Sequence, residues 1–303
     1  MPVHNRRHRP GTSTLRRAAG VMTLGLSLVL STQAGAVTDT PKPGEILDLS
    51  RQETLSPDEL YRRLDRAQLI LIGEQHDNPR HHAVESLLLG ELVRPGTAVV
   101  FEMLGPDLPL ADLGVTSSKQ ELSTALEAGT GGWDWDSYAP LYRLTLEQGG
   151  KLVSGNLSRE QINALYQGDE TGLPEAETSS RGAISAAVRE RLGEEIEQQH
   201  CEPVPEERLG PMVDIQLARD ARMAAQLKQG ADRQPAVLVA GGFHVRKDLG
   251  VPQQLDAADS AVVLLVSVRD SGRSLAAGSC SRHRLPITSG LPRPSRRAIT
   301  APK

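Results

Sequence analysis

Aromatic residues and cysteines are both scarce in this sequence. Its 303 residues include only two Trp, four Tyr and two Phe, so the core of any folded domain must be aliphatic. The two cysteines, Cys201 and Cys280, lie in no C-x-x-C or Cys/His ligand pattern, which argues against a metal site built on cysteine. Beyond the first 36 residues, the sequence also lacks an apolar run long enough to span a membrane.

Acidic residues are absent from both ends of the chain. Residues 1–36 carry five Arg, and residues 281–303 carry five Arg and one Lys. Because the formal net charge of the whole chain is −4, residues 37–280 carry about −15. A surface that binds nucleic acid is basic, so this acidic body argues against nucleic acid as a partner. It is compatible with a metal or a metalloporphyrin.

Residues 1–36 have the three parts of an export signal. Five Arg precede an apolar segment from Ala18 to Leu30, and Ala34-Gly35-Ala36 is an A-x-A cleavage site. The apolar segment is too short to span a bilayer comfortably, which favours cleavage over a retained anchor. We therefore expect an exported, periplasmic protein that is soluble after signal cleavage. No cysteine stands directly after the apolar segment, so we expect no lipobox for lipid attachment.

Export divides the chain into three expected parts, namely a signal peptide (1–36), a folded domain (37–280) and a disordered basic tail (281–303). The tail has Pro and Arg throughout and no hydrophobic periodicity. In an oxidising compartment, Cys201 and Cys280 either form a disulfide or remain two unpaired thiols. A disulfide would connect the end of the domain to a loop in the middle of the chain.

Short apolar runs alternate with helical patterns through the body of the chain. The runs predict strands at 68–72, 97–101, 151–154, 236–240 and 261–268. Helices are predicted at 56–65, 79–93, 118–128, 137–148, after Ser158, at 183–198 and at 206–229. Residues 37–55 read as a polar lead-in and 168–182 as a loop. The alternation predicts an α/β fold, a mostly parallel central sheet with helices on both faces and a helical insertion.

Polar groups follow four of the predicted strands at their carboxyl ends. They are Gly73-Glu74-Gln75-His76, Glu102, Gly155-Asn156 and Gly241-Gly242-Phe243-His244. Ligands of open α/β sheets bind beyond these ends. If Glu74 and Glu102 lie near each other, one of them should have a raised pKa, which suits a general base or a metal ligand. Either alone is more often a surface or capping residue, but the combination predicts a shared site.

Histidines add to this predicted site. His76 and His244 are candidate ligands or proton shuttles. In the helix after the first strand, one of His81 and His82 can face the same cleft, and Glu85 lies one turn beyond His82.

Half of the eight aromatic residues fall between Trp133 and Tyr142, in the sequence WDWDSYAPLY. One interpretation is a loop held to the core by Trp, with Ser137 capping the next helix. The other is an aromatic platform for a flat ligand, with Tyr138 or Tyr142 as a phenolate ligand to ferric haem. The residues alone do not decide between the two.

The combined motifs resemble those of the ChaN-like haem-binding proteins, whose superfamily includes Tiki proteases and erythromycin esterases. The resemblance spans roughly residues 45–270 and rests on GEQHDNPRHH, VVFEM, WDWDSYAPLY, GN at 155, QLARDARMA at 216 and GGFH at 241. It implies a ChaN/Tiki-type fold, a surface or periplasmic location, and haem binding linked to iron uptake. The superfamily motif maps onto Glu74, His76, Glu102 and His244.

We therefore predict an exported haem-binding protein that acts in haem and iron acquisition. Its ligand is expected in a cleft at the strand ends, with Tyr138 bound to the haem iron. The expected haem contacts are Glu74, His76, His82, Glu102, Trp135, Tyr138, Asn156 and His244. Arg80 or Arg143 would offset the acidic body near the haem propionates. An outer-membrane haem receptor and a second copy of the chain are the expected partners.

The same residues are compatible with two other functions. The first is a hydrolase, with or without a divalent metal, in which Glu74 is the general base and His76 and His244 assist. The second is a structural role in which these polar groups only satisfy one another.

Overall fold

The computed structural model describes residues 42–127, 132–200, 202–232, 234–255 and 260–267. All of them belong to one compact unit, Thr40–Lys303. The expected signal peptide, the basic tail, Cys201 and Cys280 lie outside the described residues, so the cleavage and disulfide predictions stay predictions. None of the helices formed by the described residues has the length and apolar composition of a membrane span.

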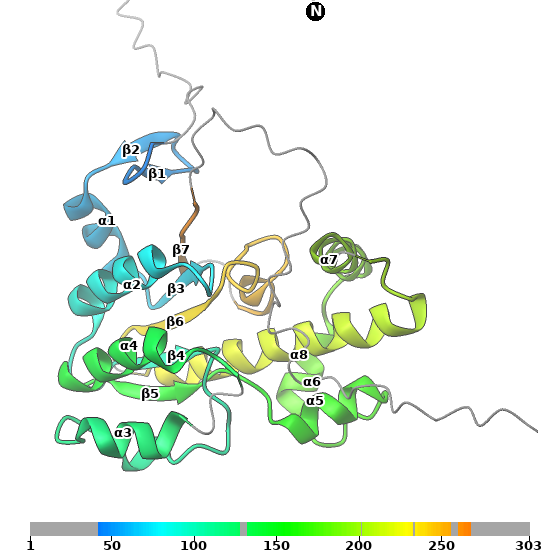
Figure 1. Cartoon of the computed structure of the whole chain (residues 1–303). Helices are drawn as coiled ribbons and strands as arrows, with labels where there is room; N and C mark the ends of the chain where they lie inside the picture. The colour runs from blue at the N-terminus through cyan, green and yellow to red at the C-terminus, as the bar shows by residue number, and fades with distance from the viewer. Residues whose placement is uncertain (1–41, 128–131, 201, 233, 256–259, 268–303) are drawn as a thin grey trace, which may run out of the picture. The chain divides into compact units, whose positions relative to one another are not determined.

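A five-stranded parallel sheet forms the centre of the fold (Figure 1). Its strand order is β5-β4-β6-β3-β7, with β3 Leu69–Glu74, β4 Ala98–Phe101, β5 Lys151–Ser154, β6 Ala236–Gly241 and β7 Ser260–Leu264. The predicted α/β fold is confirmed. Since β6 lies between β3 and β4, the carboxyl ends of these three strands are neighbours.

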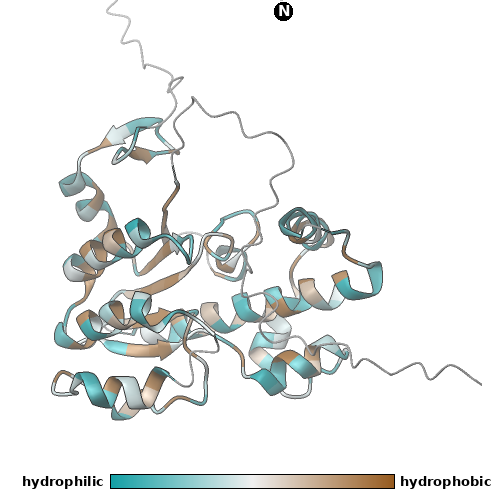
Figure 2. Ribbon diagram, in the orientation of Figure 1, coloured by the Kyte–Doolittle hydropathy of each residue, from teal (hydrophilic) through white to brown (hydrophobic). Residues whose placement is uncertain are grey.

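The two faces of the sheet are covered by different helices. These are α1 Pro57–Leu64, α2 Pro79–Leu92, α3 Lys119–Leu126 and α4 Trp135–Glu147 on one face, and α8 Glu206–Gly230 on the other. Successive side chains of a strand point to opposite faces, so Ile70 and Ile72 pack with α2 and α4 whereas Leu69 and Leu71 pack with α8. In Figure 2 the central strands are correspondingly coloured as hydrophobic.

The predicted helical insertion is present and has two apolar clusters of its own. It consists of α5 Arg159–Tyr166, α6 Glu175–Gly182, α7 Ala186–Gln199 and the first turns of α8. The loop predicted for 168–182 is wrong, because α6 occupies its second half. The sequence shows no apolar periodicity for α6 because its buried face carries ion pairs instead of apolar side chains. Arg222 Nε lies 2.7 Å from Glu177 Oε1, and Arg181 Nη1 lies 2.9 Å from Asp214 Oδ1.

Three further predictions need correction. The polar lead-in at 37–55 contains an antiparallel hairpin, β1 Ile46–Asp48 and β2 Glu53–Leu55, whose three-residue strands are too short to show periodicity. The last strand ends at Leu264, not at 268. Helix α4 begins two residues early, with Asp134 at its N-cap, and Ser137 donates a hydrogen bond to Asp134 instead of capping the helix. This early start places Trp135 and Tyr138 on the first turn of α4.

Candidate functional site

The carboxyl ends of β3, β4 and β6 bring two buried carboxylates together through one histidine. Nδ1 of His76 lies 2.9 Å from Glu74 Oε1, and its Nε2 lies 3.6 Å from Glu102 Oε2. Gly241 makes this possible, because a Cβ atom there would stand only 2.6 Å from His76 Nε2. The predicted convergence of Glu74, Glu102 and His76 at one sheet edge is therefore present.

The cluster continues from Glu102 to helix α8. Nε2 of His244 lies 3.4 Å from Glu102 Oε1, and its Nδ1 lies 2.6 Å from Asp220 Oδ1. The backbone N–H of Gly241 donates to Glu102 Oε2 over 2.8 Å. Carboxylate and imidazole groups thus alternate from Glu74 to Asp220, a residue that the sequence did not single out.

The histidines keep Glu74 and Glu102 ionised. Burial alone would raise the pKa of Glu102, but His244 and His76 outweigh it and hold that pKa well below the usual range. Burial also opposes ionisation of Glu74, whose pKa is nevertheless lowered to about 2 by the hydrogen bond with His76 and by the neighbouring His82. The expectation that one of these two carboxylates has a raised pKa is wrong, because protonated or donating groups lie between them.

His244 is correspondingly held in its charged form. Burial disfavours the charge, but Glu102 and Asp220 raise the pKa of His244 to about 10. Burial raises the pKa of Asp220 and its ion pair with His244 partly offsets this. Burial lowers the pKa of Arg219, which is 5% exposed and carries a second positive charge next to Glu102 and Asp220.

We predict that stability falls in alkali because of His244. A folded-state pKa of about 10 against 6.5 unfolded means that its contribution is complete below pH 6.5 and is lost as the pH rises to about 10. Glu85, with a folded pKa of about 9, acts in the same direction between about 4.5 and 9. Thermal denaturation from pH 6 to 10.5 should show a steeper loss of Tm in the wild type than in His244→Gln. Equal slopes would contradict the assignment.

Helix α2 supplies a third carboxylate behind Glu74. Nε2 of His82 lies 2.8 Å from Glu74 Oε2, and Glu85, one turn further along α2, is fully buried. Burial and the negative charge of Glu74 raise the pKa of Glu85 to about 9. The carboxyl group with the raised pKa is therefore Glu85, and Glu74 beside it is the ionised partner.

The aromatic block lies partly in the core and partly over this cluster. Tyr138 is 1% exposed and donates a hydrogen bond to Glu74 Oε1 over 2.7 Å, and its oxygen lies 3.0 Å from His76 Nδ1. The Trp133 ring packs on His76 at a centroid distance of 4.4 Å, and Trp135 packs on Tyr142 at 6.2 Å. Burial and Glu74 raise the pKa of Tyr138 far above its usual value, so it is a neutral phenol in this environment.

Two of the other predicted site residues, Asn156 and His81, hold the backbone around the cluster. Asn156 donates to the backbone carbonyl of Glu102 over 2.9 Å and so fixes the end of β4. His81 accepts the backbone N–H of Gln75. Arg80 is exposed, and Arg143 is paired with Glu147 at 2.5 Å.

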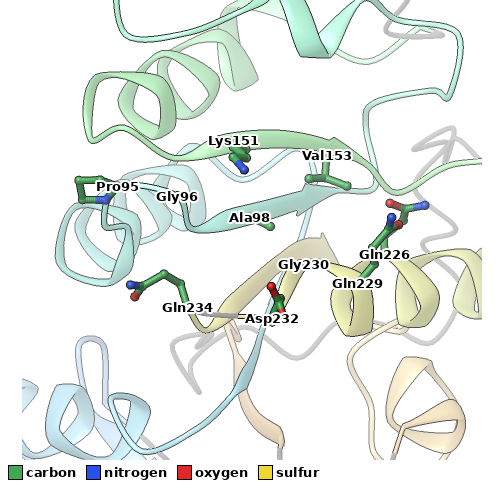
Figure 3. Close-up of a pocket in the computed structure, with 10 residues that line it drawn as sticks. All are labelled: Pro95, Gly96, Ala98, Lys151, Val153, Gln226, Gln229, Gly230, Asp232 and Gln234. Carbon is green, nitrogen blue, oxygen red and sulfur yellow. The ribbon is translucent and has the colours of Figure 1, made fainter.

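A hollow of about 690 Å³ lies at the other end of the sheet (Figure 3). Its lining includes Gly96, Lys151, Gln226, Gln229 and Gln234, which lie near the amino ends of β4, β5 and β6. None of the clustered carboxylates and histidines belongs to this lining. The chemical groups of the site and this hollow are thus separate features.

Comparison with known proteins gives two matches. The family model described as haem-binding uptake, Tiki superfamily, ChaN matches residues 60–255. A solved structure described as "Cofacial heme binding to ChaN of Campylobacter jejuni" is similar with a TM-score of 0.61 and 26% sequence identity. The alignment covers 75% of this chain and 92% of that chain. No curated protein sequence matches.

Proposed function

The chain belongs to the ChaN family of haem-binding uptake proteins in the Tiki superfamily, and from this premise we propose that it binds haem for iron acquisition. The solved structure of the Campylobacter jejuni protein, described as a haem complex, covers most of the same fold and supports the proposal. We propose that the haem lies at the carboxyl ends of the strands, where the aromatic block meets the cluster of carboxylates and histidines.

The observation that carries this proposal is the hydrogen-bonded group of Tyr138, Glu74 and His76 beneath Trp133. A tyrosine oxygen binds ferric haem as a phenolate, so its proton must be given up on binding. Glu74 already accepts the hydrogen bond from Tyr138 over 2.7 Å, and His76 Nδ1 lies 3.0 Å from the same oxygen. The Glu74 carboxylate is placed to take up the phenol proton when the positive iron offsets the surrounding negative charge, and His76 stays beside both oxygens as a donor.

Haem can reach the Tyr138 oxygen only after neighbouring rings move. The oxygen is buried, and Tyr138 packs against Trp133 with ring centroids 6.1 Å apart. His76 has a 17% exposed side chain and lies directly under Trp133. We propose that Trp133 and His76 turn outward on binding, so that they contact the porphyrin together with Trp135.

The remaining expected contacts act from below or from the rim. We propose that four of them hold Glu74 and His76 in place beneath the porphyrin. His82 contacts Glu74 and Glu102 contacts His76, whereas His244 and Asn156 contact Glu102. Arg80 is the proposed partner of a haem propionate, since Arg143 is already paired with Glu147.

The location and partners of the chain are proposed on other grounds. The expected signal peptide supports export to the periplasm, where an outer-membrane haem receptor would be the partner that delivers haem. The Campylobacter jejuni protein is described as binding haem cofacially, and haems that face each other would lie at adjacent sites. We therefore propose a homodimer that forms around the haem.

A titration of the mature chain with ferric haem tests the function. We expect a Soret band that shifts and saturates at a defined stoichiometry, with the visible bands of a tyrosinate-bound ferric haem. Light scattering on the same samples should give the mass of two chains when haem is present. A Soret band that does not saturate would overturn the proposal.

Hydrolysis is the second candidate function, favoured by the chain of carboxylate and imidazole groups. Glu74 is ionised and borders His76, as a general base requires, and His244 is charged and positioned by Asp220. A screen of ester and peptide substrates on haem-free protein tests this function. Turnover that disappears in Glu74→Gln would support a hydrolase, and absence of turnover in the wild type would reject it.

A further inference from the structure

Several buried polar atoms without a hydrogen-bond partner gather behind Glu74. In the described part of the chain, nine buried side-chain atoms have no such partner. Four of them are Glu74 Oε2, His82 Nε2 and both carboxyl oxygens of Glu85. A buried polar atom without a partner destabilises the folded protein, so four such atoms in one place call for an explanation.

These atoms are arranged as ligands around one point. Each of Glu74, His82 and Glu85 offers one ligand atom, and the three atoms lie within 4.8 Å of one another. His82 Nε2 and Glu74 Oε2 are 2.8 Å apart but lack the alignment of a hydrogen bond. Two metal-ligand atoms that lie close together without a hydrogen bond between them are expected when both point toward one cation.

We propose that Glu74, His82 and Glu85 bind a divalent transition-metal cation, of the Zn²⁺, Mn²⁺ or Fe²⁺ class, next to the haem site. Sequence spacing supports the arrangement, because His82 and Glu85 are three residues apart on α2 and therefore on the same helix face.

The ligand set selects the class of cation. One imidazole nitrogen with two carboxylates suits borderline transition metals. Ca²⁺ takes six to eight oxygen ligands and Mg²⁺ keeps several waters, which a three-ligand buried site does not provide. Glu74 is 3% exposed, His82 8% and Glu85 0%.

The proposed cation site is distinct from the haem site although both use Glu74. Oε1 of Glu74 faces Tyr138 and His76, whereas Oε2 faces His82. The cation would therefore stand on the far side of the carboxylate from the proposed haem. The proposed cation site does not depend on haem binding, so either proposal can be rejected without affecting the other.

Metal titration of tag-free, haem-free mature chain tests the site, with Zn²⁺ and then Mn²⁺ as probes in calorimetry. The wild type should bind one equivalent of at least one of these ions and gain thermal stability. Glu85→Gln should lower the affinity at least tenfold, and His82→Gln should do the same. Glu91→Gln, an exposed residue of the same helix, is the matched control and should bind as the wild type does.

Each outcome of these titrations either supports or rejects the proposed cation site. Gln has the shape of a protonated Glu, so Glu85→Gln should fold, and circular dichroism checks this. No stoichiometric binding of either ion by the wild type would overturn the site. Equal affinity in Glu85→Gln and wild type would also overturn it, as would binding that is lost in His244→Gln but kept in His82→Gln. Haem titration of Glu85→Gln, with an unchanged Soret band expected, separates this result from the proposed haem function.

Discussion

Glu102→Gln should lower the free energy of unfolding by about 3–5 kcal/mol, the usual cost of removing one partner from a buried ion pair. Glu102 is 2% exposed, and its carboxylate faces His244 at 3.4 Å and His76 at 3.6 Å. Gln keeps the shape and an acceptor for the Gly241 N–H but removes the negative charge. The charged His244 is then left with Asp220 as its remaining carboxylate contact. Denaturant unfolding measures the change.

The matched control is Glu147→Gln, which removes an exposed carboxylate paired with Arg143 on α4. This helix-surface pair should contribute only about 0.3–0.5 kcal/mol. A second readout is the pKa of His244, which nuclear magnetic resonance should find lower in Glu102→Gln than in the wild type. An unchanged pKa together with unchanged stability would mean that Glu102 does not hold the cluster together.

Tyr138→Phe should raise the Kd for ferric haem roughly 100-fold, about 2.7 kcal/mol of binding free energy. The variant removes one oxygen, the one that donates to Glu74 Oε1. Without it the iron loses its proposed phenolate ligand, so the tyrosinate bands should disappear from the visible spectrum. The absorption titration that detects haem binding in the wild type measures both effects.

Tyr142→Phe provides the control for this change. Tyr142 is also fully buried on α4, and its ring stacks near Tyr138 at 6.4 Å, but its hydroxyl has no hydrogen-bond partner in the described residues. Removal of that hydroxyl should leave the haem spectrum unchanged. If the two variants bind haem alike and keep the tyrosinate bands, Tyr138 is not the ligand.

Much of the fold was predictable because buried parallel strands show as short apolar runs. The ends of such strands meet at one sheet edge, so Glu74, Glu102 and the Gly-Gly-Phe-His segment at 241–244 could be assigned to one site without a structure. The helices predicted to begin at Ser56 and after Ser158 are present as α1 and α5, and both serines form capping boxes. These features depend on neighbours in the sequence or on the period of a single strand.

The site residues that the sequence did not reveal are brought to the site by the packing of helices against the sheet. Asp220 lies in the middle of the 25-residue helix α8, and only the position of α8 against the sheet brings it to His244. Glu85 follows His82 by three residues, but whether that face of α2 turns toward Glu74 is decided by the helix orientation. The charge state of the site was misjudged because it depends on where the histidine side chains lie. His76 stands between Glu74 and Glu102, and His82 and His244 approach these two carboxylates from other segments.

The most direct test is a crystal structure of the haem complex with anomalous diffraction at the iron edge. The proposal predicts an iron peak at the carboxyl ends of β3 and β6, bound to the oxygen of Tyr138 and with Trp133 and His76 displaced from their present positions. An iron peak at the hollow lined by Lys151 and Gln226, or one bonded to a residue outside this cluster, would contradict it.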